Sequence, residues 1–259
     1  MNMKVVILCG GVGYRLKEET EFKPKPMVAV GNQPILWHIM KIYSHYGFNE
    51  FIVVLGYKGD YIKDYFLNQK YASDNFTLNT KNGSIKILKS NNYKDEFKIT
   101  FIDTGQETLP GERILMVKDY IPEEDKDFMV TYGDGVSDVN IGDLVKFHKK
   151  NGKVVTLTAV PLMSPFGIME LNKDNEVTQF KEKPKLNHWM NGGFYVFSRD
   201  IFNYLKSGHD LEKGAFEALA KEKKIAAFRH EGFWKSMNTL KDVIELNEMF
   251  ERGEMPWIR

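Results

Sequence analysis

The chain has 259 residues, 42% of them hydrophobic, and a formal net charge of +1. This length can bury a sizeable core, and the balanced charge excludes a global field that draws the chain to nucleic acid or to an anionic membrane. A single cysteine excludes an intrachain disulfide framework and favours a reducing compartment. The amino-terminal apolar run is too short for a signal peptide or a membrane span, so we expect a cytoplasmic protein.

The first predicted element is a buried strand over residues 5–8, which runs into a glycine-rich turn. An unbroken apolar run of this kind is typical of a parallel strand covered on both faces. The turn contains three glycines and a cation, which are Gly10, Gly11, Gly13 and Arg15. Backbone amides can approach a ligand closely at glycine, and amides beside a cation favour phosphate. Lys23 and Lys25 follow in a proline-stiffened loop, so we expect more negative charge than one phosphate carries.

The glycine spacing excludes two common nucleotide sites. The third glycine of the dinucleotide fingerprint is missing, because Leu16 stands there. No Gly-Lys-Ser/Thr follows, so the turn is not a P-loop either. A Rossmann dehydrogenase is therefore disfavoured, and a purely structural turn is the alternative to a phosphate site.

Strands and helices alternate over the next part of the chain. Residues 33–46 carry apolar side chains at helical spacing, and residues 51–55 form a second apolar run. Asp60 can cap a helix over residues 61–67. This order predicts a mostly parallel sheet with helices on both faces. Residues 68–92 break the pattern, and we expect an irregular excursion there, with a hairpin and subunit contacts as alternatives.

A second informative turn follows a strand predicted over residues 128–132. Gly133, Asp134 and Gly135 close this strand at its carboxyl end, where open α/β sheets bind ligands. A lone aspartate in a turn is usually a turn residue. Beside a phosphate-binding turn, however, Asp134 is better explained as a ligand of Mg²⁺, which prefers one or two carboxylates plus phosphates and water.

The second half of the chain predicts further strands and a group of polar residues. We expect strands over residues 98–102, 154–160 and 191–197, a hairpin over 166–180, and a short strand near 225–229. The rest of residues 200–259 is expected to be helical, apart from a loop over 230–238. Four residues beside this hairpin offer the donors, acceptors and cation that a sugar phosphate needs; they are Glu182, Lys183, Asn191 and Gly192. A solvated lysine is the alternative for Lys183.

These motifs, taken in order, resemble the sugar-1-phosphate nucleotidylyltransferases, and within that family the glucose-1-phosphate cytidylyltransferase group. The resemblance runs nearly end to end and is weakest over residues 68–92. It is carried by the segments Gly10–Leu16, Lys23–Met27, Pro34–Met40, Gly56–Gly59, Phe166-Gly167, Glu182–Pro184, Asn191–Phe194 and Pro256-Trp257.

The resemblance implies a three-layer, Rossmann-like α/β nucleotidyltransferase fold. Its central sheet would be mixed but mostly parallel, with a small hairpin part that binds sugar. One domain would cover residues 1–259, with 1–135 mainly for the nucleotide and 136–259 mainly for the sugar phosphate. The substrates would be CTP and a sugar 1-phosphate, with α-D-glucose 1-phosphate as the expected sugar phosphate, and the products would be a CDP-sugar and pyrophosphate. Mg²⁺ is the implied cofactor and a homo-oligomer the implied assembly.

The resemblance also assigns individual residues to each substrate. Those that fall on nucleotide positions are Leu8, Gly10, Gly11, Gly13, Tyr14, Arg15, Lys25, Thr108, Arg113 and Gly133. The sugar-phosphate positions are Glu182, Lys183, Asn191 and Gly192, and the catalytic group is Arg15, Lys25, Asp134 and Lys183. Arg15 would hold the leaving phosphates, Lys25 the α-phosphate, and Lys183 would aim the attacking phosphate oxygen.

Two residues depart from the pattern of the family. Tyr14 stands where the family usually has Thr or Ser. Asn238 stands where it normally has Asp as the second metal ligand, so one negative charge is lost and Asp134 is left as the carboxylate ligand. We therefore expect weaker metal binding, a different preferred divalent ion, or lower activity. Two alternatives stay open. One is the same chemistry on another sugar phosphate or nucleotide, since base choice depends on loop contacts. The other is a sugar-nucleotide-binding homologue with weakened catalysis, which the loss of charge at Asn238 favours.

Overall fold

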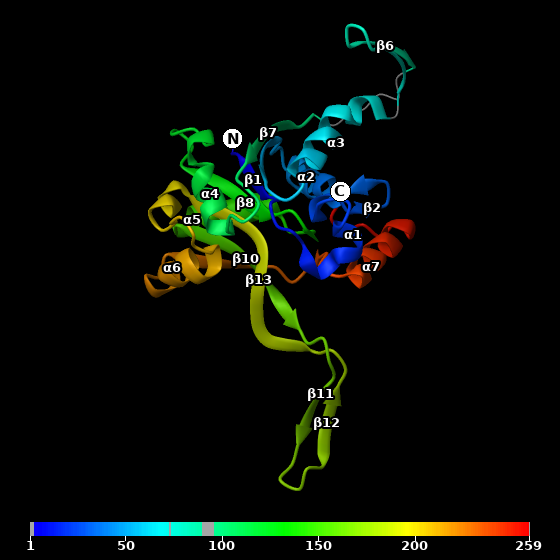
Figure 1. Cartoon of the computed structure of the whole chain (residues 1–259). Helices are drawn as coiled ribbons and strands as arrows, with labels where there is room; N and C mark the ends of the chain where they lie inside the picture. The colour runs from blue at the N-terminus through cyan, green and yellow to red at the C-terminus, as the bar shows by residue number, and fades with distance from the viewer. Residues whose placement is uncertain (1–2, 73, 90–95, 259) are drawn as a thin grey trace.

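A seven-stranded mixed sheet runs through the centre of the molecule (Figure 1). The structure is a computed structural model that describes residues 3–72, 74–89 and 96–258. The strand order is β14-β10-β13-β8-β1-β4-β7. Their bounds are β1 (Val5–Leu8), β4 (Glu50–Leu55), β7 (Lys98–Asp103), β8 (Asp127–Tyr132), β10 (Val155–Met163), β13 (Lys185–Ser198) and β14 (Ile225–Arg229). Only β13 runs against its neighbours, pairing antiparallel with both β8 and β10, which confirms the mixed, mostly parallel sheet.

Helices cover both faces of this sheet and make three layers. The α-helices are α1 (Lys17–Thr20), α2 (Ile35–His45), α3 (Gly59–Ala72), α4 (Pro110–Met116), α5 (Ile141–Asn151), α6 (Glu217–Lys221) and α7 (Leu240–Glu251). Shorter helical turns are η1 (Tyr14–Leu16), η2 (Lys25–Met27), η3 (Lys118–Tyr120), η4 (Arg199–Asn203) and the π-helical η5 (Leu211–Phe216). In the described ranges, no helix is long and apolar enough to cross a membrane.

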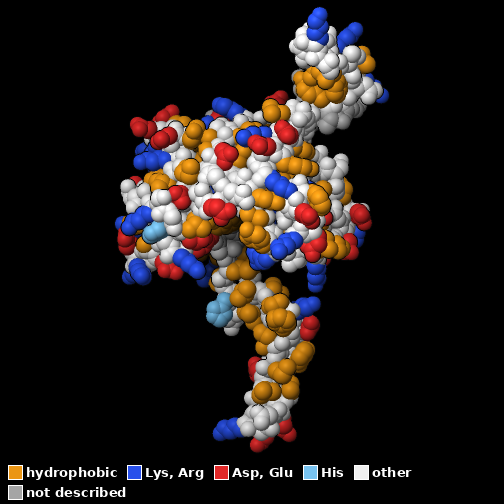
Figure 2. All heavy atoms as spheres, in the orientation of Figure 1, with side chains coloured by type: hydrophobic (Ala, Val, Ile, Leu, Met, Phe, Trp, Pro, Cys, Tyr) orange, Lys and Arg blue, Asp and Glu red, His pale blue; other side chains and the backbone are white. Residues whose placement is uncertain are grey.

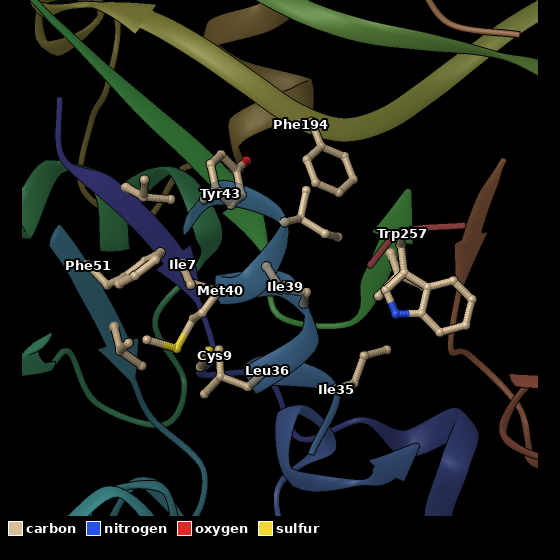
Figure 3. Close-up of a cluster of buried hydrophobic side chains, with 14 of the residues drawn as sticks. Ile7, Cys9, Ile35, Leu36, Ile39, Met40, Tyr43, Phe51, Phe194 and Trp257 are labelled. Carbon is tan, nitrogen blue, oxygen red and sulfur yellow. The ribbon is translucent and has the colours of Figure 1, made fainter. Parts of the chain in front are cut away.

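Each face of the sheet has its own buried cluster, because successive side chains of a strand point to opposite faces. In β1, Val5 and Ile7 belong to one cluster, whereas Val6 and Leu8 belong to the other. The first cluster packs under α2 (Figure 3), whose inward side chains include Leu36, Ile39, Met40 and Tyr43. The second packs under α4, η5 and α6. The buried helix α2 therefore fixes the strand that carries the glycine-rich turn.

Two hairpins project from this body at opposite ends (Figure 1). One is the arm, defined here as β11 (Ile168–Leu171) with β12 (Val177–Lys181). The other pairs β5 (Asn75–Asn79) with β6 (Ser84–Lys89). The arm confirms the hairpin predicted over 166–180. The second hairpin confirms that alternative for the described part of 68–92; residues 73 and 90–92 lie outside the described residues.

Three predicted boundaries are wrong, two of them because of strand pairing. Strand β13 begins at Lys185 and not at Asn191, because its pairing with β10 continues to the Met163–Lys185 pair. Helix α3 continues past residue 67 to Ala72. The loop predicted over 230–238 contains β15 (Trp234–Ser236), which pairs with β9 (Gly135–Ser137). A further small pair joins β2 (Ala29–Val30) to β3 (Gln33–Pro34).

Candidate active site

A cavity of about 350 Å³ lies at the carboxyl ends of the parallel strands. We call it the first cavity. Its lining comes from the turn after β1, from the loop after β7, and from the turn after β8. The lining residues are Leu8, Cys9, Gly10, Gly11, Gly13, Lys25, Pro26, Gln106, Glu107, Thr108, Leu109, Pro110, Arg113, Tyr132, Gly133 and Asp134. The predicted phosphate-binding turn and the predicted metal ligand therefore share one cleft.

A second cavity of about 280 Å³ adjoins the first. Tyr132 and Asp134 line both cavities, so the two meet at the end of β8. The remaining lining comes from η1, β8, β9, β13, β15 and the residue before the cap of α7. It consists of Arg15, Thr131, Gly135, Asn191, Gly192, Gly193, Phe194, Trp234, Ser236 and Asn238. Two ligands could bind side by side, with Asp134 between them.

Two cations converge on Asp134 and Asn238 where the cavities meet. Lys25 Nζ lies 2.5 Å from Asp134 Oδ2 and donates to Asn238 Oδ1 at 2.9 Å. Arg15 Nη2 donates to the same amide oxygen at 3.0 Å. The Lys25 side chain is only 13% exposed, so its charge acts in a partly desolvated site, where electrostatic interactions are stronger than in water. The predicted residues Arg15, Lys25, Asp134 and Asn238 thus form one cluster.

Backbone pairing holds Asp134 and Asn238 in register. Strand β15 pairs with β9, and this pairing continues as the Met237 amide donates to the Asp134 carbonyl at 2.8 Å. Helix α7 begins with a capping box between Thr239 and Asp242, and the carboxylate of Asp242 also accepts the Asn238 amide at 3.0 Å. The side-chain nitrogen of Asn238 donates to Ser236 Oγ at 2.8 Å. The amide oxygen of Asn238 is consequently directed at the two cations.

Arg113 braces the wall of the first cavity from behind. Its buried guanidinium donates to the carbonyls of Leu55, Gly10 and Gln106, at 2.9, 3.2 and 3.0 Å. A Cβ at position 10 would lie 2.1 Å from Arg113 Nη1, so only glycine fits there. Burial lowers the pKa of the Arg113 guanidinium, although the group remains charged at neutral pH. The arginine holds the turns after β1 and β7 together.

Most residues predicted for the nucleotide lie in the first cavity. Those in its lining are Leu8, Gly10, Gly11, Gly13, Lys25, Thr108, Arg113 and Gly133. Arg15 lines the second cavity instead. Tyr14 is 70% exposed and lies outside both linings. Their individual roles in binding stay predictions.

The residues predicted for the sugar phosphate divide into two groups. Asn191 and Gly192 line the second cavity. Glu182 and Lys183 follow the arm and lie outside both linings, and Lys183 Nζ is 3.9 Å from Glu182 Oε1. The Lys183 side chain is 58% exposed, and its backbone has a φ of 44° where the chain turns from the arm into β13. Its catalytic role stays a prediction.

The oxygens of Asp134 and Asn238 fit a small hard cation. Both already contact one positive charge, the ammonium of Lys25, and carboxylate and carbonyl oxygens are the donors that Mg²⁺ prefers. Over residues 3–72, 74–89 and 96–258, no group of three or more His, Cys, Asp or Glu side chains could hold a metal ion by itself. A metal here therefore needs phosphate oxygens or water as additional ligands.

Several lining residues were not predicted from the sequence. The loop after β7 contributes Gln106, Glu107, Leu109 and Pro110, and the second cavity adds Tyr132, Trp234 and Ser236. The position of the loop after β7 could have been predicted, because it follows a predicted parallel strand and such loops meet at one edge of a sheet. The position of Trp234 could not have been predicted, because it depends on the pairing of β15 with β9 and on the hydrogen bond that Trp234 donates to the Gly192 carbonyl at 2.7 Å.

Comparison with known sequences identifies similar proteins along the whole chain. A family profile described as nucleotidyl transferase matches residues 4–253. A probable glucose-1-phosphate cytidylyltransferase of Bacillus subtilis is 42% identical over 257 residues, which cover 98% of this chain and 99% of that protein. The glucose-1-phosphate cytidylyltransferase of Salmonella typhimurium is 40% identical over 257 residues, covering 98% of each.

Solved structures share the same fold at lower identity. A UDP-glucose pyrophosphorylase complexed with UDP-glucose has a TM-score of 0.69 and 18% identity, covering 98% of this chain and 100% of that one. HddC from Yersinia pseudotuberculosis, complexed with GMP-PN, has a TM-score of 0.69 and 23% identity, covering 96% and 99%. These similarities confirm the Rossmann-like nucleotidyltransferase fold.

Proposed function

The chain belongs to the nucleotidyl transferase family, and we propose that it is a glucose-1-phosphate cytidylyltransferase. It would join CTP to α-D-glucose 1-phosphate and release CDP-glucose and pyrophosphate. Relatives of that name are 40% and 42% identical over nearly the full length of both chains. We also propose a cytoplasmic location, which the single cysteine favours.

The observation that carries the proposal is the cluster of Arg15, Lys25 and Asp134 where two cavities meet. An oxygen of the sugar phosphate would attack the α-phosphorus of CTP in line with the departing pyrophosphate. Because both substrates are polyanions, charge neutralisation and alignment account for most of the catalysis. Lys25 would stabilise charge at the α-phosphate and Arg15 at the leaving phosphates. No general base is needed, because the attacking oxygen is already ionised.

Divalent metals are general cofactors of this family, and Mg²⁺ is the ion that we propose here. Asp134 would hold it, with the amide oxygen of Asn238 as a neutral second ligand. When bound, the ion supplies positive charge to the phosphates of the substrates. Lys25 would then give up its contact with Asp134 and turn to the phosphates.

The division of labour along the chain is also a proposal. The first cavity is lined only by residues numbered up to 134, which supports nucleotide binding by residues 1–135. The second cavity takes most of its remaining lining from β13 and β15, which supports sugar-phosphate binding by residues 136–259. Arg15 crosses this division, because it lines the second cavity.

A substrate matrix tests the function directly. Each of ATP, GTP, CTP and UTP would be combined with several sugar 1-phosphates, and pyrophosphate release measured. We expect the highest kcat/KM for CTP with glucose 1-phosphate. Higher activity with another pair would change the substrate assignment, and no release from any pair would contradict the enzyme assignment.

A second candidate is a sugar-nucleotide-binding protein with weakened turnover. Asn238 favours it, because an amide replaces the carboxylate that the family normally has there. The combined presence of Arg15, Lys25 and Asp134 in one cluster argues against it, because binding alone does not require a charge arrangement suited to a displacement. Calorimetric binding of CDP-glucose without pyrophosphate release would support this candidate.

We also propose that the chain forms a homo-oligomer through the arm. The arm leaves large apolar side chains exposed (Figure 2), including Leu171 at 54%, Val177 at 56% and Phe180 at 58%. A two-stranded hairpin is marginal in water by itself, and exposed apolar patches of this kind mark interfaces. Sedimentation of Phe180→Ser should give a smaller species, whereas Ile244→Ser on α7 should match the unmodified chain. A monomeric unmodified chain would contradict the proposal.

A further inference from the structure

A group of hydrogen-bonded side chains lies where the two cavities meet. It contains Tyr132 from β8, Asn191 and Tyr195 from β13, and Glu212 from η5. Tyr132 lines both cavities and Asn191 lines the second, whereas Tyr195 and Glu212 line neither. Glu212 is thus a titratable group next to the site that the proposed reaction does not use.

Glu212 is the acceptor that joins the other members of the group. Its Oε1 accepts the hydroxyl of Tyr132 at 2.5 Å and the side-chain amide of Asn191 at 3.5 Å. The same amide nitrogen donates to the Tyr195 hydroxyl at 2.6 Å, and Asn191 Oδ1 accepts the Gly193 amide at 3.1 Å. The orientation of the Asn191 amide is therefore determined by its surroundings.

The helical turn that carries Glu212 is itself firmly held. Asp210 caps it by accepting the Glu212 amide at 2.9 Å. Helix α4 approaches so closely that a Cβ at Gly111 would lie 2.7 Å from the His209 carbonyl. Since α4 begins directly after the loop that lines the first cavity, the segment that carries Glu212 packs beside that loop. Burial raises the pKa of the Glu212 carboxyl, because desolvation disfavours the charged carboxylate at this position.

We propose that Glu212 is a positioning residue for the sugar 1-phosphate. It holds Tyr132 and Asn191 in the wall of the second cavity without touching either substrate. The inference rests on the proposed function and extends it, because it names a residue that sets the affinity for the second substrate. It requires an oxygen acceptor at position 212.

Two substitutions separate this role from simple structural support. Glu212→Met keeps the side-chain length but removes the acceptor, so the Tyr132 hydroxyl and the Asn191 amide lose their common partner. We expect the KM for glucose 1-phosphate to rise about tenfold, the KM for CTP to change less than threefold, and kcat to stay within threefold. Glu212→Gln keeps an oxygen acceptor, and we expect it to restore the KM for glucose 1-phosphate to within threefold of the unmodified enzyme.

The controls make a structural effect recognisable. Glu217→Met, on the exposed face five residues further along, should leave both KM values unchanged. If Glu212 only stabilised the fold, Glu212→Met would lower the melting temperature and kcat and leave both KM values alone, which would overturn the proposal. Equal impairment of the Gln and Met variants would overturn it too. If Glu212→Met does not fold, Tyr132→Phe provides the test. We expect this variant to raise the KM for glucose 1-phosphate about threefold, and an unchanged KM would overturn the proposal.

The outcome can be distinguished from a failure of the proposed function. If the unmodified protein releases pyrophosphate and Glu212→Met has an unchanged KM for glucose 1-phosphate, the positioning role alone is wrong. If the unmodified protein releases none, the proposed function is wrong, and calorimetric titration of glucose 1-phosphate into the same variants then tests the positioning role. Equal affinity of the unmodified protein and Glu212→Met would reject it.

Discussion

The two halves of the central sheet build their cavities in different ways. In the half formed by β8, β1, β4 and β7 all strands are parallel, so the turns that follow them meet at one edge and line the first cavity. In the other half, β13 runs antiparallel between β8 and β10. The second cavity is lined by the middle of β13 and by the short pair β9–β15. One cavity is thus made by strand ends and the other by pairings between distant segments.

This difference determines how strongly a substitution in each cavity should lower activity. In the first cavity, the buried Arg113 braces the wall through the carbonyls of Leu55 and Gly10. The second depends on single side chains such as Asn191, Trp234 and Asn238, whose positions rely on hydrogen bonds across the fold. Substitutions at the junction of the cavities should therefore cost the most activity, and those in supporting contacts of the second cavity should cost less.

The largest effect is expected for Asp134→Ala. The change removes the carboxylate that lines both cavities and leaves Lys25 without its anionic partner, so the proposed metal would lose its charged protein ligand. We expect kcat/KM to fall about 10³-fold, measured by pyrophosphate release. Asp143→Ala, in the first turn of α5, should be neutral. A loss of less than tenfold for Asp134→Ala would show that the two cavities do not meet functionally at this residue.

Lys25→Ala comes next, because it removes one preorganised charge and leaves the carboxylate. Turnover should fall about 10²-fold, because the loss of one preorganised electrostatic contact in a desolvated site has an effect of this size. The matched control is Lys23→Ala, since Lys23 pairs with Glu19 on the surface at 2.9 Å. Near-normal turnover of Lys25→Ala would remove this lysine from the mechanism.

The same contrast explains which features the sequence predicts. Lys25 and Asp134 could be placed together, because their segments follow β1 and β8, which are neighbouring parallel strands. The glycine-rich turn and most of the first cavity follow by the same reasoning. Local patterns such as the apolar run of β1, the helical spacing of α2 and the hairpin of the arm predicted a mostly parallel sheet with helices on both faces, whereas the mixed sheet of the nucleotidyltransferase fold followed from the family resemblance.

The second cavity could not be predicted in the same detail. The hydrogen bonds of Glu212 to Tyr132 and Asn191 span 80 and 21 residues along the chain, and no local pattern reports such a contact. Lys183 shows the opposite case. Its motif was recognisable, but its position depends on the direction in which the arm leaves the body, which is a tertiary property.

A smaller effect is expected for Asn238→Asp, which tests the charge at the junction. A second carboxylate beside Asp134 would bind a divalent cation more strongly, because Mg²⁺ prefers charged oxygen ligands. We expect the half-saturating Mg²⁺ concentration to fall about tenfold, on the scale of about 1.4 kcal/mol of added binding. Binding of Mn²⁺ in the presence of CTP, followed by electron paramagnetic resonance, gives a readout independent of turnover.

The control for this charge is Asn203→Asp, on the exposed side of η4, which should leave the metal requirement unchanged. If Asn238→Asp leaves it unchanged as well, the amide at 238 is not a metal ligand. Its role would then be limited to the contacts that it makes with Arg15 and Lys25.

The smallest effect is expected from two helix caps, one beside the second cavity and one away from both cavities. Thr239 caps α7 directly after Asn238, and Asn140 caps α5 away from both cavities. Replacing either by Ala should lower the free energy of unfolding by about 1 kcal/mol, measured with urea, because one amide at each helix start loses its acceptor. Thr239→Ala should also lower kcat about threefold, because the segment that directs Asn238 towards Lys25 loosens, whereas Asn140→Ala should leave kcat unchanged. Thr239→Ser, which retains the hydroxyl, should restore both values. Equal kcat for the two Ala variants would mean that β15 and β9 hold Asn238 without help from α7, and that the second cavity is as firmly supported by the backbone as the first.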